Sequence, residues 1–165
     1  MPEKQTVQRA KRAKRKGRSA STQSGEFVRE EMRHIRQGRH GARSTKQAIA
    51  IGLSKARRAG VALPPPKRGR VSEKTRRSAE RAYKSRQRGK STVSRRRSRA
   101  TGGALRREHR TVASRRALSR QSRSAARRRP QTERSAAARR AAGTKGRAGR
   151  SVAARKAART RARHM

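Results

Sequence analysis

Apolar side chains with a helical period are confined to one part of this chain, between Ser24 and Pro66. Two sets recur there at positions i, i+4 and i+7: Val28, Met32 and Ile35, and then Ile49, Leu53 and Ala56. Residues with this spacing lie on one face of an α-helix. The pattern therefore predicts two helices, over about residues 25–37 and 45–59, that pack face to face as a helical hairpin.

The residues at the ends of these segments are typical of helix termini. Ser24 is the expected N-cap of the first helix, and Gly38 follows its end as a left-handed residue would. Ser44 with Gln47 has the pattern of a capping box for the second helix, and Gly60 marks its end. A run of three prolines after that glycine prevents the helix from continuing.

The rest of the chain holds too little apolar surface for a large core. Hydrophobic residues make up 28% of the 165 residues, aromatic residues 1%, and the net charge is +45. We therefore predict a mostly α protein with three parts: a basic arm (1–18), the hairpin (19–66, with a linker over 19–24) and a basic tail (67–165). The arm and tail are expected to be disordered or conditionally helical, because their helices have no face to bury. The helix-capable pieces of the tail are 72–88, 104–129, 132–142 and 151–163.

Charge on this scale indicates a polyanionic partner. The three parts carry net charges of +7, +6 and +32, and such self-repelling segments compact when phosphates neutralise them. Nucleic acid fits better than a membrane, because no apolar face opposes the basic residues and no apolar run is long enough to span a bilayer. The protein is expected to stay in the cytoplasm.

The composition argues against an enzyme and against a cofactor. The chain has no cysteine and no aspartate, and its four histidines are scattered. Neither a catalytic triad nor a paired-carboxylate arrangement nor a metal-ligand spacing is recognisable. His34 and His40 lie six residues apart across a glycine, and we expect them to be solvated or to contact phosphate rather than to bind metal.

The turn over residues 38–43 is the most suggestive part of the hairpin. Two glycines three apart let the backbone approach a phosphate, and the turn leads to a helix N-terminus, which favours anions. It is interpreted as a phosphate clamp, with glycines that serve only to cap and turn the chain as the alternative. The block over residues 11–16 is interpreted as a phosphate-binding arm, or else as a nuclear-import signal. The predicted nucleic-acid-binding residues are Arg39, His40, Gly41, Arg43, Ser44, Lys46, Lys55, Arg57, Arg58, Lys11, Arg12, Lys14, Arg15 and Lys16.

Three stretches of residues 1–66 also resemble a known family: GEFVREE, GRHGARSTKQAIAIGLSKARRAG and the LPPP that follows. They are similar to a family of small, strongly basic bacterial proteins of unknown function, often labelled DNA-binding or plasmid-stabilisation proteins. The tail resembles those of bacterial histone-H1-like proteins in composition only, and it departs from them in having 30 Arg against six Lys. The resemblance implies a bacterial, DNA-associated role and supplies no catalytic residue.

These observations lead to a hypothesis about function. The chain is expected to be a non-enzymatic, sequence-independent DNA-binding protein of the nucleoid-associated or histone-like type, which neutralises and bridges phosphate backbones. One alternative is an RNA-binding accessory factor, for example one associated with ribosomal RNA, because arginine also stacks on bases. The other is an interaction module that forms a homodimer through the two apolar stripes and uses the tail for localisation.

Overall fold

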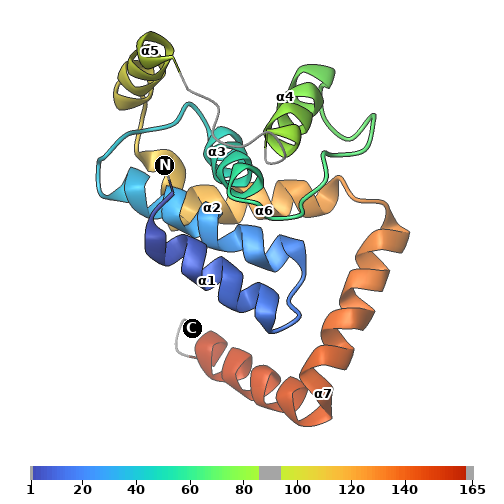
Figure 1. The fold of residues 1–165 in the computed structure, drawn as a ribbon. Helices are drawn as coiled ribbons and strands as arrows, with labels where there is room; N and C mark the ends of the chain where they lie inside the picture. The colour runs from blue at the N-terminus through green and yellow to red at the C-terminus, as the bar shows by residue number, and fades with distance from the viewer. Residues whose placement is uncertain (1, 86–93, 163–165) are drawn as a thin grey trace. The chain divides into compact units, whose positions relative to one another are not determined.

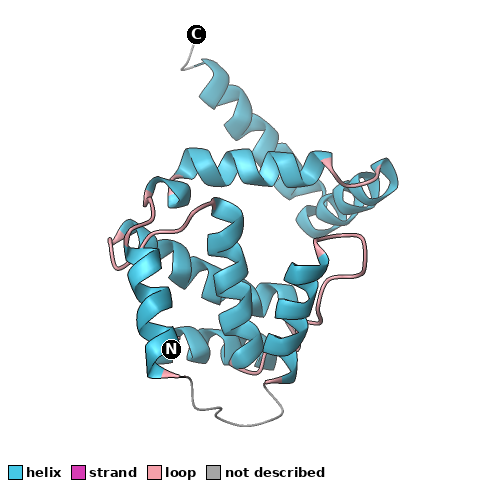
Figure 2. Cartoon of the chain, turned by 90° about the horizontal axis from the view of Figure 1, so that it is seen from above, coloured by secondary structure: helices cyan, strands magenta, loops and turns pink. Residues whose placement is uncertain are grey.

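The computed structural model describes residues 2–85 and 94–162, and this part of the chain folds into helices joined by loops, without a strand (Figures 1 and 2). The mostly α class is confirmed. A two-helix hairpin between disordered arms is wrong, because the arms are helical as well. The helices are α1 (Lys4–Arg15), α2 (Ala20–Arg36), α3 (Thr45–Arg58), α4 (Glu73–Lys84), α5 (Arg95–Arg106), the 3-10 helix η1 (Thr111–Ala113), α6 (Arg115–Arg127) and α7 (Gln131–Ala162).

The predicted hairpin is present as α2 and α3. The α2 side chains of Met32 and Ile35 are buried against Ala48 of α3, with Val28 and Ile49 at the edge of the same apolar cluster. The two backbones approach closely at Gly52, where a Cβ atom would lie 2.7 Å from the Cα of Val28. Only glycine permits this packing, so the apolar stripes and the glycine together set the hairpin.

The start of α2 was placed wrongly. The helix begins at Ala20, and its N-cap is Ser19, whose side chain accepts a hydrogen bond from the Thr22 backbone N–H at 3.3 Å. Ser24 is buried inside the helix and donates its hydroxyl hydrogen bond to the Ser21 carbonyl at 3.0 Å. The linker expected over residues 19–24 is therefore the first turn of α2, because serine and threonine can close their hydrogen bonds locally within a helix.

The N-terminal segment is a packed helix rather than a free arm. α1 lies alongside α2 (Figure 1) and brings Ala10 into a second apolar cluster with Phe27, Ala56 and Val61. Phe27 is 1% exposed in this cluster. Val7 borders the cluster too, three residues before Ala10, so α1 has a short apolar face after all.

Part of the tail also packs on the hairpin, against the expectation that it has no face to bury. The carbonyl of Leu105 accepts a hydrogen bond from the Gly41 N–H at 2.7 Å, and that of His109 accepts one from the Ala42 N–H at 3.2 Å. Ala113 of η1 is fully buried in the first apolar cluster. The segment over residues 105–113 therefore completes the core, and the single helix predicted over 104–129 is interrupted there.

Of the remaining helices, α4 and α7 follow the predicted pieces more closely, whereas most of α5 was not predicted. α4 begins after Ser72, where the piece over 72–88 was expected to start, and the Ser72 side chain caps it; Ala79 and Ala82 of α4 are buried. The predicted stop of this helix at Gly89 lies outside the described residues. α7 covers the piece predicted over 132–142 and, as far as Ala162, the piece predicted over 151–163, with a non-helical residue at Gly146 (φ 63°) between them.

The chain divides into two compact units, Met1–Gln121 and Ser122–Met165. This division differs from the boundary expected at Pro66, because α4 and residues 105–113 belong to the first unit. No helix in the described residues is long and apolar enough to cross a membrane. The apolar stripes that suggested a homodimer pack against segments of the same chain.

Candidate functional site

The turn that was interpreted as a phosphate clamp uses its backbone donors inside the molecule. The N–H groups of Gly41 and Ala42 are bonded to the carbonyls of Leu105 and His109. A Cβ atom on Gly41 would lie 1.9 Å from the Glu108 carbonyl oxygen, so glycine is required for this contact. Gly38 has a φ of 75°, as the sequence predicted. The geometry therefore supports the alternative, in which the glycines turn the chain and admit a neighbouring backbone.

The fourteen predicted binding residues fall into two groups. In the first group the side chains are exposed cations without a hydrogen-bond or ion-pair partner among the described residues: Lys11, Arg12, Lys14, Arg15, Lys16, Arg43, Lys46 and Arg58. The second group is engaged in the fold: Arg39, His40, Gly41, Ser44, Lys55 and Arg57. Binding of nucleic acid by either group stays a prediction, but only the first group is free to contact phosphate without rearrangement.

Two of the engaged residues hold the ends of α3. The Ser44 hydroxyl accepts a hydrogen bond from the Gln47 N–H at 3.2 Å, as the predicted capping box requires, and the Gln47 side chain accepts one from the Arg43 N–H at 2.6 Å. Arg57 is 6% exposed and donates to the Leu63 carbonyl at 3.1 Å. Burial lowers the pKa of the Arg57 guanidinium below its ordinary value. The hydrogen bond from Arg57 to Leu63 fixes the start of the polyproline segment to the end of α3.

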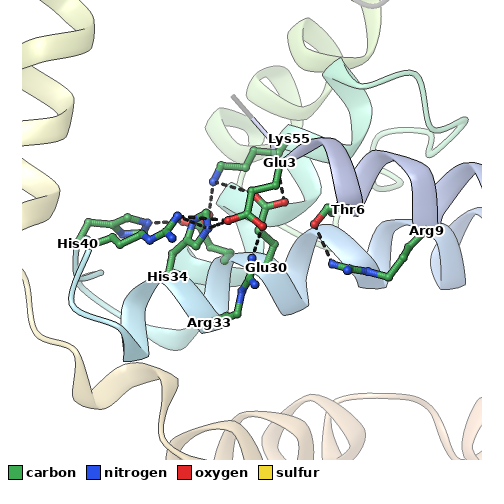
Figure 3. Close-up of polar contacts among 10 residues, drawn as sticks. Glu3, Thr6, Arg9, Glu30, Arg33, His34, His40 and Lys55 are labelled. Carbon is green, nitrogen blue, oxygen red and sulfur yellow. Dashed lines mark hydrogen bonds and ion pairs between the residues drawn. The ribbon is translucent and has the colours of Figure 1, made fainter.

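A buried polar cluster that the sequence did not predict lies between α1, α2 and α3 (Figure 3). At its α1 end, the Glu3 carboxylate is 2.8 Å from the Nε2 of His34 and 3.2 Å from Arg39 Nη1, and it is also bonded to Arg33. The His34 and Arg33 contacts lower the pKa of the Glu3 carboxyl from 4.5 to about 2. His34 is buried rather than solvated, so the expectation for it was wrong.

The centre of the cluster holds two adjacent carboxylates, Glu30 and Glu31, which are 1% and 0% exposed. Lys55 of α3 donates to Glu31 Oε2 at 2.5 Å, and the backbone N–H of Glu3 donates to Glu30 Oε2 at 3.2 Å. The other oxygen of each carboxylate, Oε1, is buried and has no hydrogen-bond donor in the described part of the chain. Buried carboxylates are costly unless each oxygen has a partner, so these two Oε1 atoms are the positions of the cluster at which a further donor or cation could bind.

Two histidines lie close to Glu31. His40 Nε2 is 3.4 Å from Glu31 Oε1, and the rings of His34 and His40 meet edge to face with centroids 6.3 Å apart. One ligand atom from each of Glu31, His34 and His40 lies within 4.8 Å of the other two.

A signal for this cluster was present in the sequence. Phe27, Glu31 and His34 fall at i, i+4 and i+7, so a buried Phe27 places the other two on the buried face of α2. In a helix that started at residue 25, as predicted, both glutamates would lie in the first two turns. Because the helix starts at Ala20, both lie in its interior.

Similarity to known proteins is found only in the N-terminal part of the chain. No curated protein and no solved structure matches the chain. One family model does match, and it covers α1, the hairpin and the polyproline segment that follows, which is where the predicted resemblance lies. Residues 3–68, about two-fifths of the chain, are thus similar to the Family of unknown function (DUF6496).

Proposed function

We propose that this protein binds nucleic acid through the phosphate backbone, without reading base sequence, and that it acts as a nucleoid-associated protein. The observation that carries the proposal is the excess of exposed cations over carboxylates. The chain has 53 Lys and Arg against eight Glu, and three of those carboxylates are used in the cluster of Glu3, Glu30 and Glu31. The surface cations therefore outnumber the protein's own counterions several times over, and phosphates would supply the rest.

Two regions offer such cations. On α1 the five cations over residues 11–16 are all exposed, and the apolar contacts of Ala10 and Val7 hold the helix in place. In the second unit, residues 122–165 carry 15 Lys and Arg against one Glu. Every arginine of α7 whose side chain is described is exposed. We expect α1 to dock rigidly and the second unit to add most of the charge.

Aromatic platforms for stacking bases are missing from the described surface, which supports a backbone binder. Phe27 is buried, and Tyr83 is half-buried on α4. Single-strand readers rely on exposed aromatic rings, so recognition of that kind is not part of the proposal. Arginine binds phosphate bidentately in either nucleic acid, so RNA is the competing target and DNA the one we favour.

Crosslinking in living cells, followed by sequencing of the nucleic acid recovered with the full chain, tests this function directly. We expect DNA fragments spread broadly over the chromosome without a shared motif. Recovery dominated by ribosomal RNA would favour the RNA-binding alternative instead. Recovery of neither nucleic acid above an untagged control would overturn the proposal.

Salt dependence in vitro tests which residues make the contacts. The affinity for duplex DNA should fall as salt rises, with a slope of about 0.9 in log–log form per phosphate neutralised. Replacing the five cations over residues 11–16 by Ala should flatten this slope, and so should a matched set of five from α7: Arg147, Arg155, Lys156, Arg159 and Arg161. An unchanged slope for the α1 variant, with a reduced one for the α7 variant, would exclude the cations over residues 11–16 from the interface.

A further inference from the structure

We propose that Glu31, His34 and His40 form a binding site for a divalent transition-metal ion of the zinc class. Each residue offers one ligand atom, and the three atoms lie within 4.8 Å of one another. Figure 3 shows the two histidine side chains next to each other beside the carboxylates of the cluster. This site is separate from the exposed cations of the proposed nucleic-acid interface.

The chain brings the three side chains together by two local devices. Glu31 and His34 are three residues apart on α2, so they lie on the same face of the helix. His40 returns to that face because Gly38 adopts a left-handed conformation (φ 75°) directly after the helix. The hydrogen bond from the Gly41 N–H to Leu105 then holds the turn against the core. The positions of the ligands are therefore set by the fold rather than by the ion.

The distances are close to those of a tetrahedral site. Bonds of about 2.0–2.1 Å from zinc to nitrogen and oxygen place neighbouring ligand atoms about 3.4 Å apart. The Nε2 of His40 and the Oε1 of Glu31 are separated by 3.4 Å. The ligand atom of His34 lies within 4.8 Å of the other two atoms, so it must move closer to them to reach the same spacing.

The buried carboxylate supplies an independent reason for a cation here. Glu31 is 0% exposed, and its Oε1 atom has no hydrogen-bond donor among the described residues, although the Oε2 atom is bonded to Lys55. An unsatisfied charged oxygen in a protein interior is costly, and a metal ion would satisfy it. The same Oε1 atom lies 3.4 Å from His40 Nε2, a contact that is an ion pair only when the histidine is protonated.

The ligand types select the class of metal. Two imidazole nitrogens and one carboxylate oxygen suit zinc and its neighbours among the divalent transition metals, whereas magnesium and calcium prefer sites made of oxygen atoms. Glu3 Oε1 is 2.8 Å from His34 Nε2, so it is within reach as a further ligand or as the partner that orients the ring. A metal at this site would join the end of α2 to the turn and would stabilise the fold.

Nearby cations oppose the metal. Lys55, Arg33 and Arg39 surround the cluster, and they face the three carboxylates of Glu3, Glu30 and Glu31. Lys55 is the direct competitor, because its ammonium group already contacts Glu31. Removing that ammonium should therefore tighten metal binding, which gives the proposal a gain-of-affinity test.

The first experiment titrates zinc chloride into the full chain after nucleic acid has been removed. We expect one zinc ion per chain by equilibrium dialysis, with imidazole NMR signals of two of the four histidines shifting, those of His34 and His40. The signals of His109 and His164 serve as internal references. Equal shifts for all four rings, or for none, would overturn the proposal, and this measurement requires no variant to fold.

The second experiment compares matched variants. His40→Gln should lower the zinc affinity about tenfold or more, while His109→Gln, a substitution of an exposed histidine outside the cluster, should leave it unchanged. Lys55→Met should lower the melting temperature without zinc and should show a larger zinc-induced rise than the wild type. The site would be refuted if neither His40→Gln nor Lys55→Met changed the binding of zinc. Displacement of the zinc by magnesium at equal concentration would also refute it.

Discussion

The first three helices and α7 are similarly rich in cations, but they differ in how many side chains they bury. α2 alone buries eight residues, including Phe27 and Ile35, whereas no described side chain of α7 is buried. α7 is rich in alanine and arginine, which form helices readily but give no stripe of large side chains. Helix propensity therefore gives both regions their secondary structure, and only large apolar residues at helical spacing give one of them a core.

The folded regions also differ in what their acidic residues contact. In the first part of the chain, carboxylates join different helices: Glu3 of the α1 N-cap contacts α2, Glu26 contacts Arg9, and Glu31 contacts Lys55. In α4, Glu73 and Glu80 pair with cations of the same helix. Ion pairs between helices can fix an arrangement in space, while pairs within a helix support only that helix.

The largest effect should come from Phe27→Ala, which removes the aromatic side chain at the centre of the second apolar cluster. Truncating a buried phenylalanine costs about 3–5 kcal/mol, and a core this small has little stability in excess. We expect the cooperative unfolding transition followed by circular dichroism to be lost or to move to a much lower temperature.

The matched control for Phe27→Ala is Val152→Ala in α7, where the side chain is 63% exposed. This substitution should leave the transition where it is. Equal effects of the two variants would show that the contrast between the two regions is wrong.

The next effect in size concerns the contact between the turn and the tail. A Cβ atom at Gly41 would lie 1.9 Å from the Glu108 carbonyl oxygen, so Gly41→Ala should push the segment over residues 105–113 away from the core. Overpacking of this kind costs about 1–3 kcal/mol. Amide exchange should then become faster at Ala42 and Ala113.

A glycine in α5 provides the control for this variant. A Cβ atom at Gly103 meets nothing within 4 Å, so Gly103→Ala should stabilise its helix slightly, by about 0.5–1 kcal/mol. Slower exchange in the Gly41→Ala variant than in the wild type would contradict the packing described for the turn.

Local signals in the sequence predicted what local interactions determine. The hairpin, the Ser44 cap, the left-handed Gly38 and the Ser72 start of α4 all follow from residues within a few positions of one another. The stripe of Met32 and Ile35 was recognised because helical periodicity is itself a short-range pattern.

The parts that were missed depend on contacts between distant segments. Residues 105–113 complete the core through backbone hydrogen bonds to Gly41 and Ala42, which no side-chain pattern reveals. Glu31 and His34 share the buried face of α2, but charged residues on such a face are interpreted as solvated unless a partner is known. Their partners, Lys55 and Glu3, come from 24 and 31 residues away. The spacing on α2 could therefore have placed Glu31 and His34 on the buried face, but it could not have identified the distant residues that complete the cluster.

The third prediction concerns nucleic-acid affinity. Deleting residues 130–165 removes 11 Lys and Arg and one Glu from the end of the chain, and it leaves the whole of the first unit intact. Duplex DNA affinity should fall about tenfold or more at moderate salt, and the salt dependence should flatten by about 0.9 per lost phosphate contact. The melting temperature of the core should not change. An unaltered affinity would mean that the core alone carries binding.

The smallest effect should be seen in α4 on acidification. The hydrogen bond with Arg76 lowers the pKa of the Glu73 carboxyl, and that with Lys84 lowers the pKa of Glu80. A carboxyl with a lowered pKa contributes stability above its ordinary value of 4.5, and the contribution is lost as the pH falls through the lowered value. The protection of α4 amides, taken relative to their intrinsic exchange rate at each pH, should therefore fall below pH 4.5.

The test of this effect is a difference between two chains, because acid also weakens the ion pairs of Glu3 in the core. In the double variant Glu73→Gln, Glu80→Gln, α4 keeps its length and its buried Ala79 and Ala82 but loses both titrating groups. The protection of α4 in the variant should already be lower at neutral pH and should change less on acidification than in the wild type. The same pH dependence in both chains would show that the ion pairs of α4 do not contribute to its stability. The pH dependence of α4 would then come only from its packing against the core.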